Sequence, residues 1–393
     1  MSDVLVVGGG FAGVWSALGA ARVLRGRRSV TLVAPGDDLV IRPRLYQANP
    51  QDMRVPLDRV LAPVGVRRVP ATVTGVDVRR RRVTATGRDG AALDLPFQRL
   101  VLAAGSEVVR SEVPGAEHLH DVDTLESATA LDRHLHALPA GPGRFTAVVV
   151  GAGFTGVEIA TELVGRLREI AGPQAERVRV VLVERADVVG PELGPGPRPV
   201  IEAALDDLGV ELRLGTSLES VAPDAVHLSD GSELPARTAV WTAGVRANPL
   251  TTCVPGPRDR LGRLETDEFL QVTGVSGVYA AGDTAAAPVD SEHVALPSCQ
   301  HALPLGRFAG HNVAADLLGL EKVPFRPDPY VTCLDLGGAG AVFTTGWERT
   351  VRSSGEAAKE RKRKVNEDWI YPPLDDPAEI LRRADHRVST RRS

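Results

Sequence analysis

The apolar positions of the chain repeat one arrangement twice: a short run of β-branched residues, a glycine-rich turn, and a segment with apolar residues at helical spacing. The first copy begins with Val4–Val7, which predicts a buried strand, and its helix runs to about Leu24. The second copy is Val148–Glu162, in which Val148–Val150 predicts the strand and Val157–Leu167 carries the helical spacing. Both copies therefore have the strand–turn–helix order of a βαβ unit.

Each turn carries glycines at G-x-G-x-x-G spacing. In such a turn the first glycine permits the bend and the second lets the backbone approach a pyrophosphate. The third glycine lets the helix pack closely on the strand. The phosphates then meet the amide-rich, positive end of the helix. The sequence therefore predicts two dinucleotide sites, one at Gly8, Gly10 and Gly13 and one at Gly151, Gly153 and Gly156.

The strand after each fingerprint differs at the position that usually holds a ribose. Val178–Val183 ends in Glu184, whose carboxylate would accept both ribose hydroxyls and repel a 2′-phosphate, which favours NADH over NADPH. Arg185 weakens this inference, since arginine can hold a 2′-phosphate. Ser29–Val33 is instead followed by Ala34.

At this first site the ribose acid is therefore missing from its usual place. Either Asp37 or Asp38 supplies the acid from the following loop, or the ribose is held in another way.

Further elements follow from alternation and from glycine or proline boundaries. Residues 66–95 predict small antiparallel strands with a turn at 87–90, and Pro297–Leu318 predicts a helix. Buried strands end in Ala104–Gly105, in Gly244 and in Gly282–Asp283. From about Pro327, two strands joined by a glycine turn are expected.

Composition narrows the class of protein. The 393 residues suffice for two or three domains, and 43% hydrophobic with 24% charged residues is ordinary for a globular protein. A net charge of −4 gives no reason to expect nucleic acid or an anionic membrane as partner. The three cysteines form no C-x-x-C pair, so neither a redox-active dithiol nor a metal site is expected.

The same pattern of cysteines suits a reducing cytoplasm. The N-terminus lacks the basic region of a signal peptide, and no stretch offers about 20 consecutive apolar residues. We expect a cytoplasmic protein whose membrane contact is at most peripheral.

The order of the motifs resembles that of the two-dinucleotide-binding-domain flavoproteins, the pyridine nucleotide–disulfide reductase superfamily. Within it, the chain is most similar to type II NADH dehydrogenases, which are NADH:quinone oxidoreductases. Four segments carry the likeness: RPRLYQ at 42–47, GFTGVEIATEL at 153–163, WTAGV at 241–245 and SCQHALPLGRFAGHNV at 298–313.

The resemblance implies an α/β fold with two Rossmann-like domains and a small C-terminal α+β segment. A split FAD domain would comprise residues 1–112 and 257–325, with an NADH domain, 113–256, inserted between its parts. Residues 326–393 would shape the acceptor side or an interface. The implied cofactors are FAD and NADH, the partner is a small-molecule electron acceptor, and a homodimer is left open.

The same resemblance assigns roles to individual residues. Gly8, Gly10 and Gly13 would take the FAD pyrophosphate, and Asp283 the ribityl chain. Glu158 would lie at the flavin–nicotinamide contact, although a first-turn acid favoured by the helix dipole is the alternative; Glu162, one turn on, is interpreted as structural. The remaining cofactor contacts are expected at Ala104, Gly105, Gly151, Gly153, Thr155, Gly156, Glu184, Gly244 and Gly282.

The acceptor motif departs from the family pattern A-Q-x-A-x-Q. Its first glutamine is Gln300, which we predict to be catalytic, but its second is replaced by Pro304, which puts the mode of quinone binding in doubt. Cys299 stands in place of alanine and is interpreted as a small buried hydrophobe. His301 could donate a proton, but we expect a partly exposed helix histidine.

These features predict an FAD-dependent NADH oxidoreductase that passes hydride from NADH to flavin N5 and then two electrons to a quinone or quinone-like molecule. The absence of amphipathic C-terminal helices makes a soluble reductase of a specialised metabolite an alternative. A slow-turnover NADH- and FAD-binding sensor resembling apoptosis-inducing factor is a further alternative, whereas a sulfide:quinone oxidoreductase would need paired cysteines at the flavin.

The C-terminal tail adds two expectations. Lys359–Lys364 is interpreted as a solvated helix face. Trp369–Tyr371 is expected to dock on the body of the protein or on a second subunit.

Overall fold

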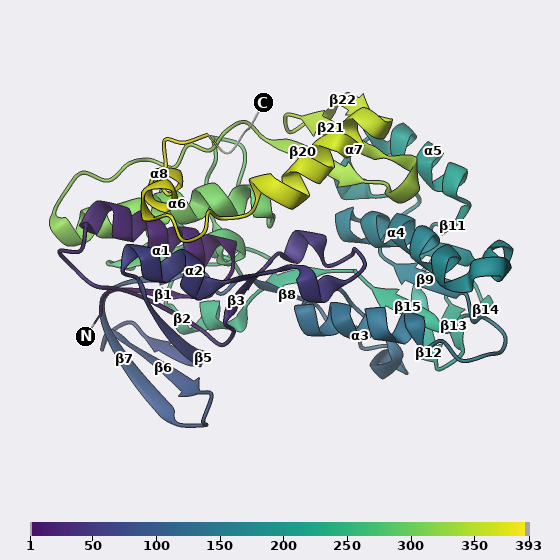
Figure 1. Ribbon diagram of the computed structural model, residues 1–393, viewed down its shortest axis with the longest axis horizontal. Coiled ribbons are helices and arrows are strands. Elements are labelled where there is room, and N and C mark those ends of the chain that lie inside the picture. The colour runs from purple at the N-terminus through teal and green to yellow at the C-terminus, as the bar shows by residue number, and fades with distance from the viewer. Residues whose placement is uncertain (1, 390–393) are drawn as a thin grey trace.

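The computed structural model describes residues 2–389, which build two parallel sheets flanked by helices (Figure 1). In the first sheet β1 pairs in parallel with β2 and β7, β5 with β2, and β18 with β7. The long strands β5 and β7 extend beyond it and pair with β6 as the predicted antiparallel ladder. The strands are β1 (Ser2–Val7), β2 (Val30–Ala34), β5 (Arg67–Asp77), β6 (Arg82–Gly87), β7 (Ala92–Leu102) and β18 (Val278–Ala280).

The second sheet has the order β11-β10-β9-β15, and all of its strands run parallel. A three-stranded antiparallel sheet, β12-β13-β14, lies beside it. The strands are β9 (Thr146–Val150), β10 (Arg179–Val183), β11 (Val210–Arg213), β12 (Leu218–Ala222), β13 (Ala225–Leu228), β14 (Glu233–Pro235) and β15 (Thr238–Trp241), and the helices are α3 (Leu125–His136), α4 (Phe154–Ala171) and α5 (Arg198–Leu208).

Before the C-terminal segment, the chain crosses between the two units twice, and the crossings pair with each other. β8 (Ser106–Val108) leads into the second unit, β16 (Val245–Ala247) leads back, and the two form an antiparallel ribbon. Smaller elements are β3 (Asp38–Val40), β4 (Arg54–Pro56), α2 (Leu57–Leu61), β17 (Leu264–Glu265) and β19 (Ala285–Ala286).

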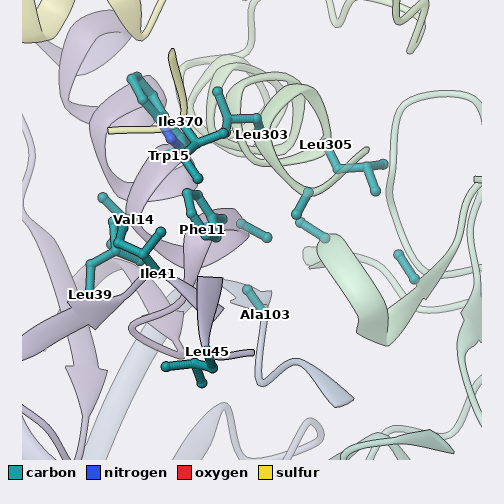
Figure 2. Packing of buried hydrophobic residues seen from close by; sticks show 14 of the residues in the cluster. Phe11, Val14, Trp15, Leu39, Ile41, Leu45, Ala103, Leu303, Leu305 and Ile370 are labelled. Carbon is teal, nitrogen blue, oxygen red and sulfur yellow. The ribbon is translucent and has the colours of Figure 1, made fainter. Parts of the chain in front are cut away.

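Helices α1 (Phe11–Leu24) and α6 (Cys299–Leu318) cross at very short distance in the first unit. A Cβ on Gly306 would lie 2.6 Å from the carbonyl oxygen of Ala12, and one on Gly310 would lie 2.2 Å from that of Ser16. Only glycine permits this approach. Figure 2 shows Trp15 of α1 packed near Leu303 of α6 and Ile370 of the C-terminal tail.

The C-terminal segment lies across both units (Figure 1). Its strands β20 and β21 are the predicted pair, whereas β22 and α8 were not predicted. The elements are β20 (Val331–Asp335), β21 (Ala341–Thr345), β22 (Thr350–Ser354), α7 (Gly355–Lys364), a π-helical turn (Val365–Trp369) and α8 (Pro377–Arg383). Ile370 is buried and Arg44 donates to the Tyr371 hydroxyl at 2.9 Å, so the tail docks on the body of the protein.

The predicted fold class is confirmed: an α/β protein with two Rossmann-like units and a small C-terminal α+β segment. The predicted domain boundaries stay predictions. Within residues 2–389, every helix is too short or too polar to cross a bilayer.

Candidate functional site

The first glycine loop fits a dinucleotide pyrophosphate. A Cβ on Gly8 would lie 2.1 Å from the carbonyl oxygen of Ala103, and one on Gly13 would lie 2.0 Å from that of Gly8, so both positions require glycine. A Cβ on Gly10 would meet nothing within 4 Å. Gly10 is also the N-cap of α1, whose first turn has no side-chain cap and no acidic residue. The amides of this turn are therefore available to an anion.

The second loop has the same geometry with one difference. A Cβ on Gly156 would lie 1.7 Å from the carbonyl oxygen of Gly151, and Gly153 is the uncapped N-cap of α4. However, Oε1 of Glu192 lies 2.2 Å from the Cβ position of Gly153. Glu192 belongs to a short 3₁₀ turn, Pro191–Leu193, in the loop after β10. The space beside Gly10 is therefore open, whereas the corresponding space beside Gly153 holds the Glu192 carboxylate.

Glu184 stabilises this loop by accepting two backbone hydrogen bonds. One carboxylate oxygen accepts from the Ala152 amide at 2.8 Å and the other accepts from the Ala186 amide at 3.0 Å. Thr155 lies exposed in the first turn of α4, and Gly244, in the left-handed region with φ 83°, follows β15 at the crossing between the units. These predicted residues therefore lie on one edge of the second sheet.

Asp283 lies where the first sheet meets the RPR motif. It follows β18, and the Ser106 hydroxyl donates to it at 2.7 Å. The guanidinium of Arg42 donates to the Ser106 hydroxyl at 3.0 Å, lies 3.7 Å from Asp283 and pairs with Asp123. Ala104 and Gly105 connect β7 to Ser106. Sequence reasoning missed Arg42, although the motif that contains it was part of the resemblance.

Glu158 is not solvated but forms a buried ion pair with Lys362 of α7. The two charged groups are 2.7 Å apart, their side chains are only 13% and 9% exposed, and Glu158 also accepts from the Asp335 amide at 3.0 Å. Burial raises the pKa of Glu158. Burial alone would lower the pKa of Lys362, but the charge of Glu158 raises it above its ordinary value. Lys362 therefore stays charged beside Glu158.

The expectation of a solvated face over Lys359–Lys364 is wrong for two of its residues. Lys362 pairs with Glu158, and Lys359 pairs with Asp335, whose side chain is 4% exposed. Both lysines turn inward because the helix packs over buried carboxylates that need counter-charges. The sequence pattern of a charged helix does not reveal carboxylates that lie far away in the chain.

Tyr46 joins the first unit to this network. Its hydroxyl donates to Asp335 at 3.0 Å and accepts from Asn366 at 3.3 Å, and burial raises its pKa well above the ordinary value. Glu162, one turn beyond Glu158, also has its pKa raised by burial. Titratable groups from all three parts of the chain therefore share one buried region around α4.

The N-terminus of α6 places the predicted acceptor residues. Ser298 caps the helix, with its hydroxyl accepting from the His301 amide at 3.3 Å. In the amide orientation that satisfies both ends, Gln300 donates to the Val331 carbonyl and accepts from the Val331 amide at 3.1 Å. Gln300 therefore fastens α6 to β20.

His301 is 2% exposed, so the expectation of a partly exposed histidine is wrong. Its ring stacks on Tyr330 at 5.4 Å, and burial lowers its pKa to about 4. The helical spacing did not show that the C-terminal segment would cover this face.

The start of α6 connects the predicted site residues of the two units. Gln300 bonds to Val331 of β20, and Glu158 accepts from the Asp335 amide of the same strand at 3.0 Å. On the other side, a Cβ on Gly282, next to Asp283, would lie 3.9 Å from the Cβ of Ala302. The α6 N-terminus thus lies within reach of both the first unit, through Asp283, and the second, through Glu158. Burial raises the pKa of Cys299, and raises that of Cys333 to about 11, so both are neutral thiols at pH 7.

Two fingerprint loops in two Rossmann-like units, with a shared buried centre between them, define an oxidoreductase that works with two dinucleotides. The signature of the pyridine nucleotide-disulphide oxidoreductases matches residues 2–306. The chain therefore belongs to that family, whose members use FAD and a pyridine nucleotide, and the predicted enzyme class and the cofactors FAD and NADH are confirmed.

Known proteins agree with this assignment. A "NADH dehydrogenase-like protein" of Mycobacterium tuberculosis is 48% identical over 403 residues, covering 100% of both chains. The demethylphylloquinone reductase of Synechocystis is 28% identical, covering 95% of this chain and 96% of its own. NDH2 of Plasmodium falciparum, solved with NADH, shares the fold with a TM-score of 0.78 and 12% identity, covering 98% and 96%.

Proposed function

We propose that the chain is an NADH:quinone oxidoreductase that takes hydride from NADH and delivers two electrons to a quinone or a quinone-like small molecule. Bound FAD would supply the redox chemistry, accepting hydride at its N5 and passing the electrons on. The single observation that carries the proposal is the position of the α6 N-terminus between the two units. It lies next to Gly282 and Asp283 on one side and is bonded on the other to β20, which contacts Glu158. A cofactor held by the first unit and a nucleotide held by the second would come together there.

In this proposal the protein positions both dinucleotides and excludes water. The amides at the start of α1 would hold the FAD pyrophosphate at Gly10, and Asp283, fixed by Ser106 and Arg42, would hold its ribityl chain. The start of α4 would hold the NADH pyrophosphate, and Glu184 the adenosine ribose. Glu158, kept beside Lys362, would orient the nicotinamide.

The α6 N-terminus would stabilise negative charge. Ser298 caps the helix, and no acidic residue lies in its first turn, so the helix end favours an adjacent anion. The positive end of this helix would stabilise the negative charge that develops when electrons enter the site. Gln300 would act as a positioning residue, because its amide holds this helix end against β20.

Anaerobic stopped-flow spectroscopy tests the proposal. The FAD-loaded protein is reduced with one equivalent of NADH and then mixed with menadione, with a ferric acceptor or with air-saturated buffer. Fast recovery of flavin absorbance with menadione alone supports the proposal. No bleaching of the flavin band by NADH would contradict it.

The soluble reductase of a specialised metabolite remains the second candidate, because of two observations. Pro304 has no side-chain hydrogen-bonding group, and both the nitrogen and the oxygen of the Gln300 amide bond to the Val331 backbone. Fast bleaching by NADH with slow recovery in all three acceptors would favour that candidate or a slow-turnover sensor. A sulfide-oxidising role is disfavoured because the raised pKa values of Cys299 and Cys333 keep both thiols neutral.

A further inference from the structure

The two fingerprint loops differ at the glycine that faces a pyrophosphate. A Cβ at Gly10 would meet nothing within 4 Å, whereas at Gly153 it would lie 2.2 Å from Oε1 of Glu192. Both glycines are N-caps of long helices without a side-chain cap. The helix end of α4 therefore has an internal anion at the place where a dinucleotide phosphate would bind.

Glu192 is an exposed residue, and the groups around it act on its pKa in opposite directions. Partial burial raises its pKa, the charge of Glu184 raises it further, and only Arg349 acts in the opposite direction. Glu192 is carried by a turn flanked by two glycines with positive φ, Gly190 at 49° and Gly194 at 78°. This carboxylate is held at the helix end without a direct ion pair in the described part of the chain.

Arg349 comes from a different part of the sequence. It lies at the tip of the hairpin between β21 and β22, in the left-handed region with φ 50°, which is uncommon for a residue with a side chain. The hairpin packs on the loop that carries Glu192, since a Cβ on Gly196 would lie 2.9 Å from the Arg349 carbonyl oxygen. The C-terminal segment therefore reaches the second dinucleotide loop.

The Arg349 guanidinium lies beside the first residue of α4. Its Cζ is 5.4 Å from the ring centre of Phe154 and 5.8 Å from that of Tyr330. One terminal nitrogen donates to the Tyr330 hydroxyl at a long 3.5 Å, and the buried Nε has no hydrogen-bond partner among residues 2–389. A buried donor without a partner is costly, so the arrangement has an unmet demand for an acceptor.

We infer that Arg349 is a pyrophosphate ligand supplied by the C-terminal hairpin, and that Glu192 occupies the pyrophosphate position until a nicotinamide dinucleotide displaces it. The inference rests on the proposed function, in which NADH binds at α4. A pyrophosphate would meet the α4 amides and a guanidinium that suits phosphate geometry. Displacement would also move Glu192 away from Glu184, which relieves a repulsion between two carboxylates.

Isothermal titration calorimetry on the FAD-loaded protein tests this directly, with ADP-ribose, NADH and adenosine as probes. Arg349→Met should weaken ADP-ribose and NADH by about tenfold to a hundredfold, the loss of one or two charge-assisted hydrogen bonds, and leave adenosine unchanged. Glu192→Gln should tighten both phosphate-bearing probes, because a neutral amide competes less for the helix end. Arg352→Met, which removes an exposed arginine from the same hairpin, is the matched control and should change nothing.

Three results decide the matter. If wild type binds ADP-ribose but Arg349→Met binds it equally well, the inference fails while the proposed function stands. If Arg349→Met weakens adenosine as much as ADP-ribose, Arg349 has only a packing role, and the inference also fails. If wild type binds neither ADP-ribose nor NADH, the proposed function fails and the inference with it.

One further variant, together with Glu192→Gln, guards against misfolding. Arg349→Lys keeps the charge and should lose less affinity than Arg349→Met, and Glu192→Gln leaves the hairpin intact. Unchanged or weaker ADP-ribose binding by Glu192→Gln would overturn the displacement half of the inference.

Discussion

Removing Lys362 should be among the most damaging single changes in this protein, because it leaves Glu158 charged and buried. The pair is 2.7 Å apart with side chains 9% and 13% exposed. Lys362 also donates to the Cys333 carbonyl at 3.1 Å, so its loss leaves a second acceptor unsatisfied. Breaking a buried ion pair from one side costs about 3–5 kcal/mol. We therefore expect Lys362→Met to lower the free energy of unfolding by that amount.

The measurement is urea unfolding followed by far-ultraviolet circular dichroism, with saturating FAD for every variant. Arg363→Met is the control on the same helix, because Arg363 pairs with Glu356 at 3.0 Å but is 52% exposed. An exposed pair contributes about 0–1 kcal/mol, so this control should unfold close to wild type.

A second comparison separates the lost pair from lost packing. Glu158→Gln combined with Lys362→Met removes both charges, and the amide that replaces the Glu158 carboxylate keeps an oxygen that can accept from the Asp335 amide. The double variant should be more stable than Lys362→Met alone, because no uncompensated charge stays buried. Glu158→Gln alone is measured as well. The reasoning is refuted if Lys362→Met unfolds like Arg363→Met, or if the double variant loses as much stability as Lys362→Met and Glu158→Gln lose together.

Three further predictions concern the remaining site residues. Glu184→Ala should raise the KM for NADH and reduce the preference for NADH over NADPH. Glu184→Gln should act in the same direction, because one amide oxygen cannot accept from both the Ala152 and Ala186 amides. Steady-state kinetics with both nucleotides checks this, and an unchanged preference would mean that Glu184 does not hold the ribose. Gln300→Ala releases α6 from β20, so it should slow the recovery of flavin absorbance by the acceptor and leave bleaching by NADH unchanged. Stopped-flow traces that show slower bleaching instead would mean that Gln300 does not lie on the acceptor side. Burial lowers the pKa of His301 from its ordinary 6.5 to about 4, so on acidification the unfolded chain binds a proton before the folded protein does. The free energy of unfolding should therefore fall as the pH is lowered from 6.5 to about 4. Urea midpoints at several pH values should show a shallower fall for His301→Gln, and an identical slope would contradict the lowered pKa of His301.

The sequence predicted most of the fold because its strongest signals are local. A glycine fingerprint between a β-branched strand and an apolar helix fixes a strand–turn–helix unit within about 30 residues. The same holds for the antiparallel strands of residues 66–95, where alternation is visible directly. Gly8 and Gly13 are required because a Cβ at either position would clash with a backbone carbonyl oxygen, and the glycine spacing alone predicts this requirement.

The parts that escaped prediction depend on contacts between distant segments. Lys359 and Lys362 look like surface residues until α7 packs over Glu158 and Asp335, which lie elsewhere in the chain. His301 was expected to be partly exposed because nothing in its helix announces that Tyr330 covers it. Likewise, the spacing that predicted Glu184 as the ribose acid could not show that its oxygens accept from two loop amides.

The strand order of the first sheet bears on how the chain folds during synthesis. β18 pairs with β7, yet the two are separated by the whole of the second unit, and α6 packs on α1 from still further along the chain. The strands β9 to β15, by contrast, form a continuous stretch that the ribosome releases before β18. Because domains generally fold as units while the chain emerges, the inserted unit can fold first. The first sheet would then be completed only after β18 has paired with β7, so in the proposed function FAD would bind late, after the second unit has folded.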